Sequence, residues 1–148
     1  ENHKACMEVM LDNGIVPVVN ENDTVSVTEL MFTDNDELSG LMAQMTNART
    51  LVLLSNIDGI YTGNPNDRES RLIASVTPDD DLSKYIMTEK SSAGRGGMES
   101  KYNTARTVAK SGIRVIIANG NRDNILPDVL TQPDRVPHTV FLSARQGR

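Results

Sequence analysis

Apolar residues follow two different spacings along this chain. One is the three-to-four-residue spacing of an amphipathic helix, and the other is a short continuous run, as in a buried strand. Helical spacing predicts helices over 5–10, 38–45, 79–87, 98–109 and 123–130. Continuous apolar runs predict strands over 15–19, 51–54, 72–76, 113–118 and 139–142, with weaker strand character over 25–32. Gly14 and Gly112 stand where the preceding helices should end.

The alternation of these elements predicts the fold class. Strands that are apolar along their whole length must be covered on both faces, and helices between them provide that cover. We therefore predict an α/β fold, a three-layer α-β-α sandwich with a mostly parallel central sheet. The 148 residues are enough for one domain with a real core.

The composition of the chain limits the kinds of partner that it can bind and the cell compartment in which it is expected. A net charge of −5, no tryptophan and 3% aromatic residues argue against a nucleic-acid surface. No apolar run is long enough to cross a membrane. The single cysteine, Cys6, excludes an internal disulfide, indicates a reducing compartment such as the cytoplasm, and is expected to be a small buried side chain. His3 and His138 belong to no metal-ligand pattern.

The most informative segment is a glycine-rich turn that leads into a predicted helix, Gly94-Arg95-Gly96-Gly97-Met98-Glu99-Ser100-Lys101. Glycines let a bulky anion approach the backbone, and a helix start offers unpaired N–H groups and partial positive charge. Lys101 adds a full charge. The spacing is not that of a Walker A loop. The turn indicates a phosphate site, and a plain loop with an exposed lysine is the alternative.

Polar clusters follow the predicted strands at their carboxyl ends, where open α/β sheets bind ligands. They are 20–23 after the first strand, Ser55-Asn56 after the second and 119–121 after the strand that ends at Ala118, and 34–36 opens a helix. Asp23 can hold a substrate ammonium, and Asn35 can pair with a substrate carboxylate. The alternative is that these residues are only turn residues and helix caps.

The ordered set of motifs resembles the glutamate 5-kinase family, within the amino acid kinase superfamily. The resemblance runs from about Gly14 to Leu142. It rests on four segments, which read PVVNEND at 17–23, DNDELS at 34–39, LLSNIDGIYT at 53–62 and GGMESK at 96–101. The Asp-Gly-Ile-Tyr stretch is shared across the superfamily, whereas Asn-Glu-Asn-Asp and Asp-Asn-Asp are closer to glutamate 5-kinase itself.

The resemblance implies an activity and residue roles. The family phosphorylates the γ-carboxylate of glutamate with ATP and magnesium, which is the first step of proline biosynthesis. Asp23 and Asn35 would bind glutamate, and Asp36 would organise the catalytic lysines. Ser55 and Asn56 would contact the nucleotide. The ATP phosphates would be wrapped by Arg95, Gly96, Gly97, Met98, Glu99, Ser100 and Lys101, with Lys101 stabilising the transition state. Mg²⁺ would be held mainly by the nucleotide phosphates, with no protein ligand assigned.

The chain departs from the family pattern in four respects. Ser55-Asn56 stands where the family usually has Thr-Asp, Arg95 where it has threonine, and Thr33 where it often has glycine. The family's first strand, with its own lysine and phosphate loop, has no counterpart here. We therefore expect residues 1–148 to be a partial amino acid kinase domain, incomplete at its N-terminus, with a frayed tail at 143–148. A homo-oligomer, dimer or tetramer, and feedback by proline are further expectations.

Three alternatives stay open. The first is another amino acid kinase, such as an acetylglutamate kinase, which would prefer the N-acetylated substrate. The second is a non-catalytic nucleotide or amino-acid sensor on the same scaffold, which need not keep both Asp36 and Lys101. The third is the kinase half of a bifunctional proline-synthesis protein.

Overall fold

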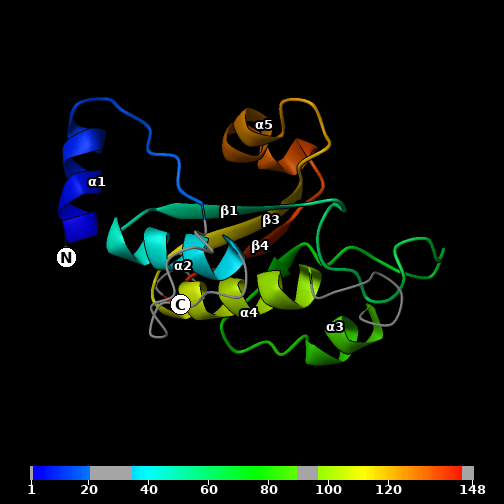
Figure 1. The fold of residues 1–148 in the computed structure, drawn as a ribbon. Coiled ribbons are helices and arrows are strands. Elements are labelled where there is room, and N and C mark those ends of the chain that lie inside the picture. The colour runs from blue at the N-terminus through cyan, green and yellow to red at the C-terminus, as the bar shows by residue number, and fades with distance from the viewer. Residues whose placement is uncertain (1, 21–34, 90–96, 145–148) are drawn as a thin grey trace.

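The computed structural model describes residues 2–20, 35–89 and 97–144 (Figure 1). Its elements are, in chain order, α1 (Asn2–Asp12), α2 (Asn35–Met45), β1 (Thr50–Ser55), β2 (Ser75–Val76), α3 (Ser83–Glu89), α4 (Gly97–Lys110), β3 (Arg114–Asn119), α5 (Ile125–Thr131), the short 3-10 helix η2 (Pro133–Arg135) and β4 (Thr139–Phe141). The five predicted helices and four of the predicted strands correspond to elements in this order. The stretch 25–32 lies outside the described residues.

The four strands form one sheet in the order β1-β3-β4-β2. β1 pairs in parallel with β3, and β2 pairs in parallel with β4. β3 and β4 run antiparallel, so two of the three pairings are parallel. The prediction of a mostly parallel α/β sheet is confirmed.

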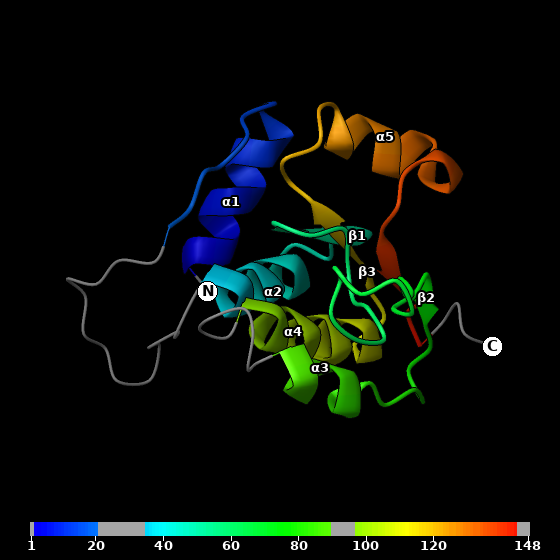
Figure 2. The same ribbon diagram turned by 90° about the vertical axis from the view of Figure 1, so that its right-hand side faces the viewer.

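Helices cover both faces of this sheet, and two separate cores result. Figures 1 and 2 show α2, α3 and α4 on one face and α5 on the other. Alternate side chains of β3 serve the two cores, since Val115 and Ile117 join the α4 side and Ile116 and Ala118 join the α5 side. Burial on both faces explains why the strand is apolar without interruption, and the three-layer prediction is confirmed.

Three helices end in the same hydrogen-bonded motif. After α1 the residue with positive φ is Gly14, and the next N–H, that of Ile15, bonds to the Met10 carbonyl at 2.8 Å. Gly112 ends α4 in the same way, as predicted. Asn47 does so after α2 with φ 52°, because asparagine also tolerates this conformation. This stop places the start of β1 directly after α2.

The N-terminal part of the chain differs from the expectation. Residues 15–19 form no strand and pair with no described strand, and Val16 and Val18 are 81% and 95% exposed. An apolar β-branched run becomes a buried strand only where neighbours satisfy its backbone and cover its side chains. None of the described strands does so here, and α1 with this segment lies beside the sandwich (Figures 1 and 2).

Two smaller expectations also change. Cys6 is exposed, not buried, because no described layer covers that face of α1. In the predicted tail, Ser143 is buried at 2% exposure, and Ala144, although exposed, donates its N–H to the Ala109 carbonyl at 3.1 Å. Residues 145–148 lie outside the described part of the chain.

Candidate active site

The structure pairs two residues that the sequence placed in one site. Asp36 lies in the first turn of α2 and Lys101 in the second turn of α4, and Lys101 Nζ is 3.2 Å from Asp36 Oδ2. The side chains are only 18% and 14% exposed. Partial burial keeps water from screening the pair, so the carboxylate fixes where the ammonium lies. A charged, positioned ammonium at a helix start is suited to a phosphoryl group.

Close packing of α2 against α4 makes this pairing possible. A Cβ atom on Gly40 would lie 2.9 Å from Thr104 Cγ2 and 3.1 Å from Val108 Cγ2, so only glycine fits without movement. A groove of about 560 Å³ runs between the two helices, and Glu37 and Ser100, next in sequence to the ion pair, line it. The helix contact therefore sets the distance between Asp36 and Lys101.

The strand ends bring together a second group of predicted residues. In the parallel register Ser55 stands opposite Asn119, and the Gly120 N–H bonds to the Ser55 carbonyl at 2.8 Å. Ser55 Oγ accepts a hydrogen bond from Ile57 N–H, and Asn119 Oδ1 accepts one from Asn121 N–H. Asn56 follows Ser55 and is exposed. Two polar turns thus lie side by side at the carboxyl edge of the sheet, as predicted.

Both groups lie at the same end of the sandwich. The C-terminus of α2 leads directly into β1, and that of α4 leads directly into β3. Each helix therefore runs back along its strand, and the helix starts that carry Asp36 and Lys101 face the end where β1 and β3 finish (Figure 1). This is the edge at which doubly wound sheets bind their ligands.

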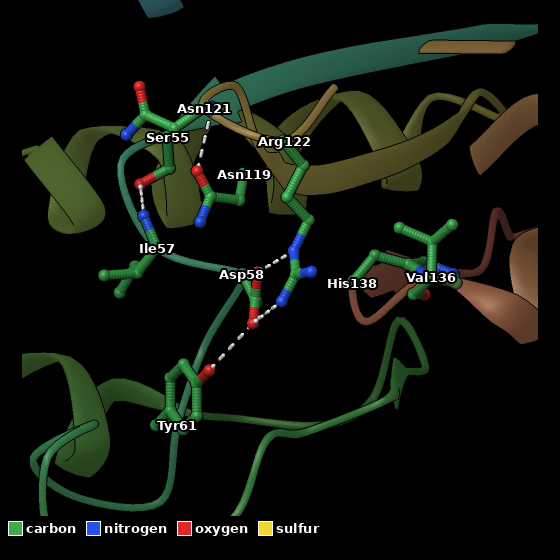
Figure 3. A network of polar contacts seen from close by, with 9 residues as sticks. All are labelled: Ser55, Ile57, Asp58, Tyr61, Asn119, Asn121, Arg122, Val136 and His138. Carbon is green, nitrogen blue, oxygen red and sulfur yellow. Dashed lines mark hydrogen bonds and ion pairs between the residues drawn. The ribbon is translucent and has the colours of Figure 1, made fainter. Parts of the chain in front are cut away.

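A polar network beside Ser55 was missed by the sequence reasoning. Arg122, after β3, donates from Nε to Asp58 Oδ1 at 2.7 Å and from Nη2 to Asp58 Oδ2 at 2.9 Å (Figure 3). The Tyr61 hydroxyl lies 3.4 Å from the same Oδ2. Asp58 and Arg122 are 64 residues apart, so neither local spacing nor a motif could reveal the pair.

The network changes the ionisation of its members. Hydrogen bonds from Arg122 are the largest cause that lowers the pKa of the Asp58 carboxyl below its ordinary value, against partial burial, which raises it. The charge of Arg122 and hydrogen bonds from Asn119 and Tyr61 lower the pKa further. The same contact raises the pKa of Arg122. Asp58 is therefore a carboxylate and Arg122 a guanidinium cation at neutral pH.

Thr139 anchors the loop after β1 at Ile60. Its hydroxyl accepts a hydrogen bond from Ile60 N–H at 2.9 Å and donates to the Ile73 carbonyl at 2.7 Å, and the residue is fully buried. A Cβ atom on Gly59 would come within 3.0 Å of the Thr139 backbone nitrogen, so this glycine allows a close approach. Thr139 therefore anchors the segment after β1 at Ile60, and Arg122 anchors it at Asp58.

The glycine turn and the first polar cluster are only partly described. Gly97 opens α4, and a Cβ atom there would meet none of the described residues within 4 Å. Met98, Glu99 and Ser100 follow in its first turn, partly exposed. Arg95, Gly96 and Asp23 lie outside the described residues. Asn35, the first residue of α2, is exposed beside Asp36.

Among the described residues, no helix combines the length and the apolar character needed to span a bilayer. No three histidine, cysteine or acidic side chains among them gather closely enough to hold a metal ion. His138 is partly buried, and its Nδ1 lies 2.6 Å from the Val136 carbonyl oxygen.

Solved structures share this fold at low identity. UMP kinase from Bacillus anthracis superposes with a TM-score of 0.62 at 12% identity, covering 95% of this chain and 51% of that one. Carbamate kinase from Giardia lamblia, bound to AMP-PNP, superposes with a TM-score of 0.59 at 18% identity, covering 95% of this chain and 49% of that one. These likenesses concern the fold alone.

Sequence similarity is closer. The chain is 60% identical over 146 residues to glutamate 5-kinase of Bacteroides thetaiotaomicron, which is 99% of this chain and 41% of that protein. It thus spans about two-fifths of that curated relative's length. The profile of the amino acid kinase family matches residues 1–119, which include both the Asp36–Lys101 pair and the ends of β1 and β3. The chain belongs to the amino acid kinase family.

Proposed function

We propose that this chain is part of a glutamate 5-kinase and supplies one side of its phosphoryl-transfer site. The observation that carries the proposal is the largely buried Asp36–Lys101 ion pair, which holds an ammonium near the start of α4. Identity of 60% to a glutamate 5-kinase supports the choice of substrate. Residues 1–148 would then be a partial amino acid kinase domain.

In the proposed reaction a γ-carboxylate oxygen of glutamate attacks the γ-phosphorus of ATP. The new oxygen–phosphorus bond forms while the bond to the bridging oxygen of ADP breaks, which gives glutamyl 5-phosphate and ADP. Negative charge spreads over the phosphoryl oxygens in flight, and a fixed ammonium at Lys101 stabilises it. Asp36 acts by holding Lys101 in place.

The remaining residues are assigned to binding. Asp23 would hold the glutamate ammonium, and Asn35 would donate to its α-carboxylate. Ser55 and Asn56, beside Asn119, would contact the nucleotide. The phosphates would lie along the turn that comprises Arg95, Gly96, Gly97, Met98, Glu99 and Ser100. Mg²⁺ would arrive on the phosphates of ATP, and we derive no step through a metal held by protein side chains.

Wider features of the proposed enzyme follow from the family resemblance. Glutamyl 5-phosphate would enter proline biosynthesis, and proline would inhibit the enzyme by feedback. The protein would act in the cytoplasm as a dimer or tetramer of identical subunits. Each of these is a proposal about the complete protein that carries this chain.

The test is a substrate comparison with the complete protein. Magnesium-ATP is supplied with free glutamate or N-acetylglutamate, and the acyl phosphate is trapped with hydroxylamine and measured as the hydroxamate. We expect turnover with free glutamate at least tenfold above that with the acetylated substrate, because Asp23 pairs with a free ammonium. Preference for N-acetylglutamate would indicate an acetylglutamate kinase, and nucleotide binding without any product would indicate a sensor.

A further inference from the structure

The two loops at the carboxyl edge of the sheet are joined by side-chain hydrogen bonds to Asp58, and the Asp58–Arg122 pair supplies the two shortest. The loop after β1 carries Ser55 and Asn56, and the loop after β3 carries Asn119. One backbone hydrogen bond, Gly120 N–H to the Ser55 carbonyl, links their bases. Arg122, in the second loop, donates hydrogen bonds to both carboxylate oxygens of Asp58 in the first loop (Figure 3).

The geometry of this pair is that of a positioning device. Two parallel N–H···O bonds at 2.7 and 2.9 Å fix the angle as well as the distance between the loops, which a single ammonium cannot do. Asp58 is 16% exposed and Arg122 is 45% exposed. An ion pair with one partner so exposed contributes little to global stability, so its main effect is on the local position of the loops.

Asn56 lies directly between two fixed points. Ser55 is held in the β1–β3 register, and Asp58 is held by Arg122, with one residue, Ile57, between Asn56 and Asp58. Loss of Arg122 would remove the strongest of the side-chain contacts to Asp58 and loosen residues 56–58. The weaker hydrogen bond from Tyr61, the bond from Ile57 N–H to Ser55 Oγ and the buried anchor at Thr139 would remain. The pair therefore controls the segment that carries the proposed nucleotide contacts.

We propose that Arg122 is a positioning residue for the nucleotide, which acts by clamping Asp58 and thereby orienting the Ser55–Asn56 segment. The inference rests on the proposed function, which identifies the nucleotide as ATP. It does not involve Lys101 or Asp36, which lie on α4 and α2. Loss of the clamp should therefore weaken binding of ATP and leave the transfer step and the glutamate site nearly unchanged.

The experiment measures kinetics and direct binding of magnesium-ATP on the complete protein. Arg122→Gln and Asp58→Asn should each raise the KM and the Kd for ATP by about five- to twentyfold, with kcat and the glutamate KM within threefold of wild type. Arg122→Lys keeps the charge but not the paired hydrogen bonds, so its KM and Kd for ATP should lie between those of the wild type and those of Arg122→Gln. Arg135→Gln, an exposed arginine in η2, is the matched control and should match the wild type.

A double variant separates clamping from two independent effects. If the two residues act through each other, Arg122→Gln with Asp58→Asn should weaken ATP binding no more than either change alone. Additive losses would overturn the clamp, as would an unchanged Kd for ATP. A fall in kcat together with a large drop in Tm would indicate a merely structural role and would also overturn it.

The design keeps the two proposals apart. Wild-type protein that binds ATP but does not phosphorylate glutamate would contradict the proposed function, while the effect of Arg122→Gln on the ATP Kd would still decide the clamp. Wild-type protein that phosphorylates glutamate, with variants that bind ATP normally, would contradict the clamp alone.

Discussion

At the scale of single residues, the proposed binding carboxylate Asp23 and the positioning carboxylate Asp36 should respond differently to substitution. Asp36 contacts the Lys101 ammonium, so replacing it removes the orientation of the group that we propose to act in the transition state. We expect Asp36→Asn in the complete protein to lower kcat by about ten- to a hundredfold with little change in the glutamate KM. Steady-state kinetics with varied glutamate and ATP measures both constants.

Asp23 is expected to give the opposite pattern. A carboxylate that pairs with the substrate ammonium contributes to ground-state binding, so Asp23→Asn should raise the glutamate KM by about tenfold or more and change kcat less. The two variants serve as controls for each other. Finding their patterns reversed would contradict the assigned roles.

The Asp58–Arg122 pair makes a prediction about pH. Folding lowers the pKa of Asp58, so the folded state favours the ionised carboxylate and the pair stabilises the fold above the ordinary aspartate pKa of about 3.9. As the pH falls through that value and then through the lower folded-state pKa, the contribution disappears. The Tm difference between wild type and Asp58→Asn should be small but present near neutral pH, and should shrink below about pH 4. A difference that stays constant across this range would contradict the assignment.

Residue-scale prediction from sequence succeeded where a motif carries the signal. The pairing of Lys101 with Asp36 followed from the resemblance, because both residues lie in family motifs. Asp58 lies in a family motif, but its contact with Arg122 escaped notice because that contact depends on how two loops meet. Thr139 was missed for the same reason, since a single threonine in a strand gives no sign of its buried hydrogen bonds.

At the scale of elements, the approach of α2 to α4 at Gly40 is the contact that positions the ion pair. Gly40→Ala gains about 1 kcal/mol of helix propensity but brings a methyl against Thr104 and Val108, whose β-branched side chains cannot easily move. Overpacking of this kind costs about 1–3 kcal/mol, so we expect a net loss of stability.

The matched test of Gly40→Ala adds a second substitution that removes the obstacle. Thr104→Ser deletes Cγ2, the atom nearest to the new Cβ, and keeps the hydroxyl. Thermal unfolding of the complete protein should show Gly40→Ala with a lower Tm and Gly40→Ala with Thr104→Ser partly restored. A higher Tm for Gly40→Ala alone would mean that the helices adjust freely.

The pattern of the sequence predicted elements better than their partners. Helical spacing located α4, and continuous apolar runs located β1 and β3, because each of these segments is buried on the side its pattern implies. The run at 15–19 is also apolar and β-branched, but it pairs with no described strand. An apolar composition indicates that a segment needs to be buried, but it does not indicate which other segment covers it. For the same reason, the sequence pattern did not indicate that β4 runs antiparallel to β3.

At the scale of the whole molecule, uncovered apolar surface is the main feature. Val9, Leu11 and the valines of 16–19 are between 49% and 95% exposed, and β1 is an edge strand among the described strands. Exposed apolar patches and unpaired strand edges favour association. Residues 1–148 expressed alone should therefore self-associate and show no measurable glutamate kinase activity.

Light scattering coupled to size-exclusion chromatography tests this expectation. Val16→Asp together with Val18→Asp should reduce the associated fraction, because both side chains are exposed. Val52→Asp is no substitute, since it would enter the packed core. A monomeric and active chain of 148 residues would contradict the partial-domain hypothesis.

The central claim is that Lys101, held by Asp36 at the start of α4, stabilises the transferring phosphoryl group. The most direct measurement is the kcat for hydroxamate formation from free glutamate by the complete protein carrying Lys101→Met, with Lys110→Met in the last turn of the same helix as control. We expect a fall of about a hundredfold or more for Lys101→Met, a smaller loss of ATP affinity, and wild-type turnover for the control. Turnover of Lys101→Met within threefold of wild type would contradict the claim.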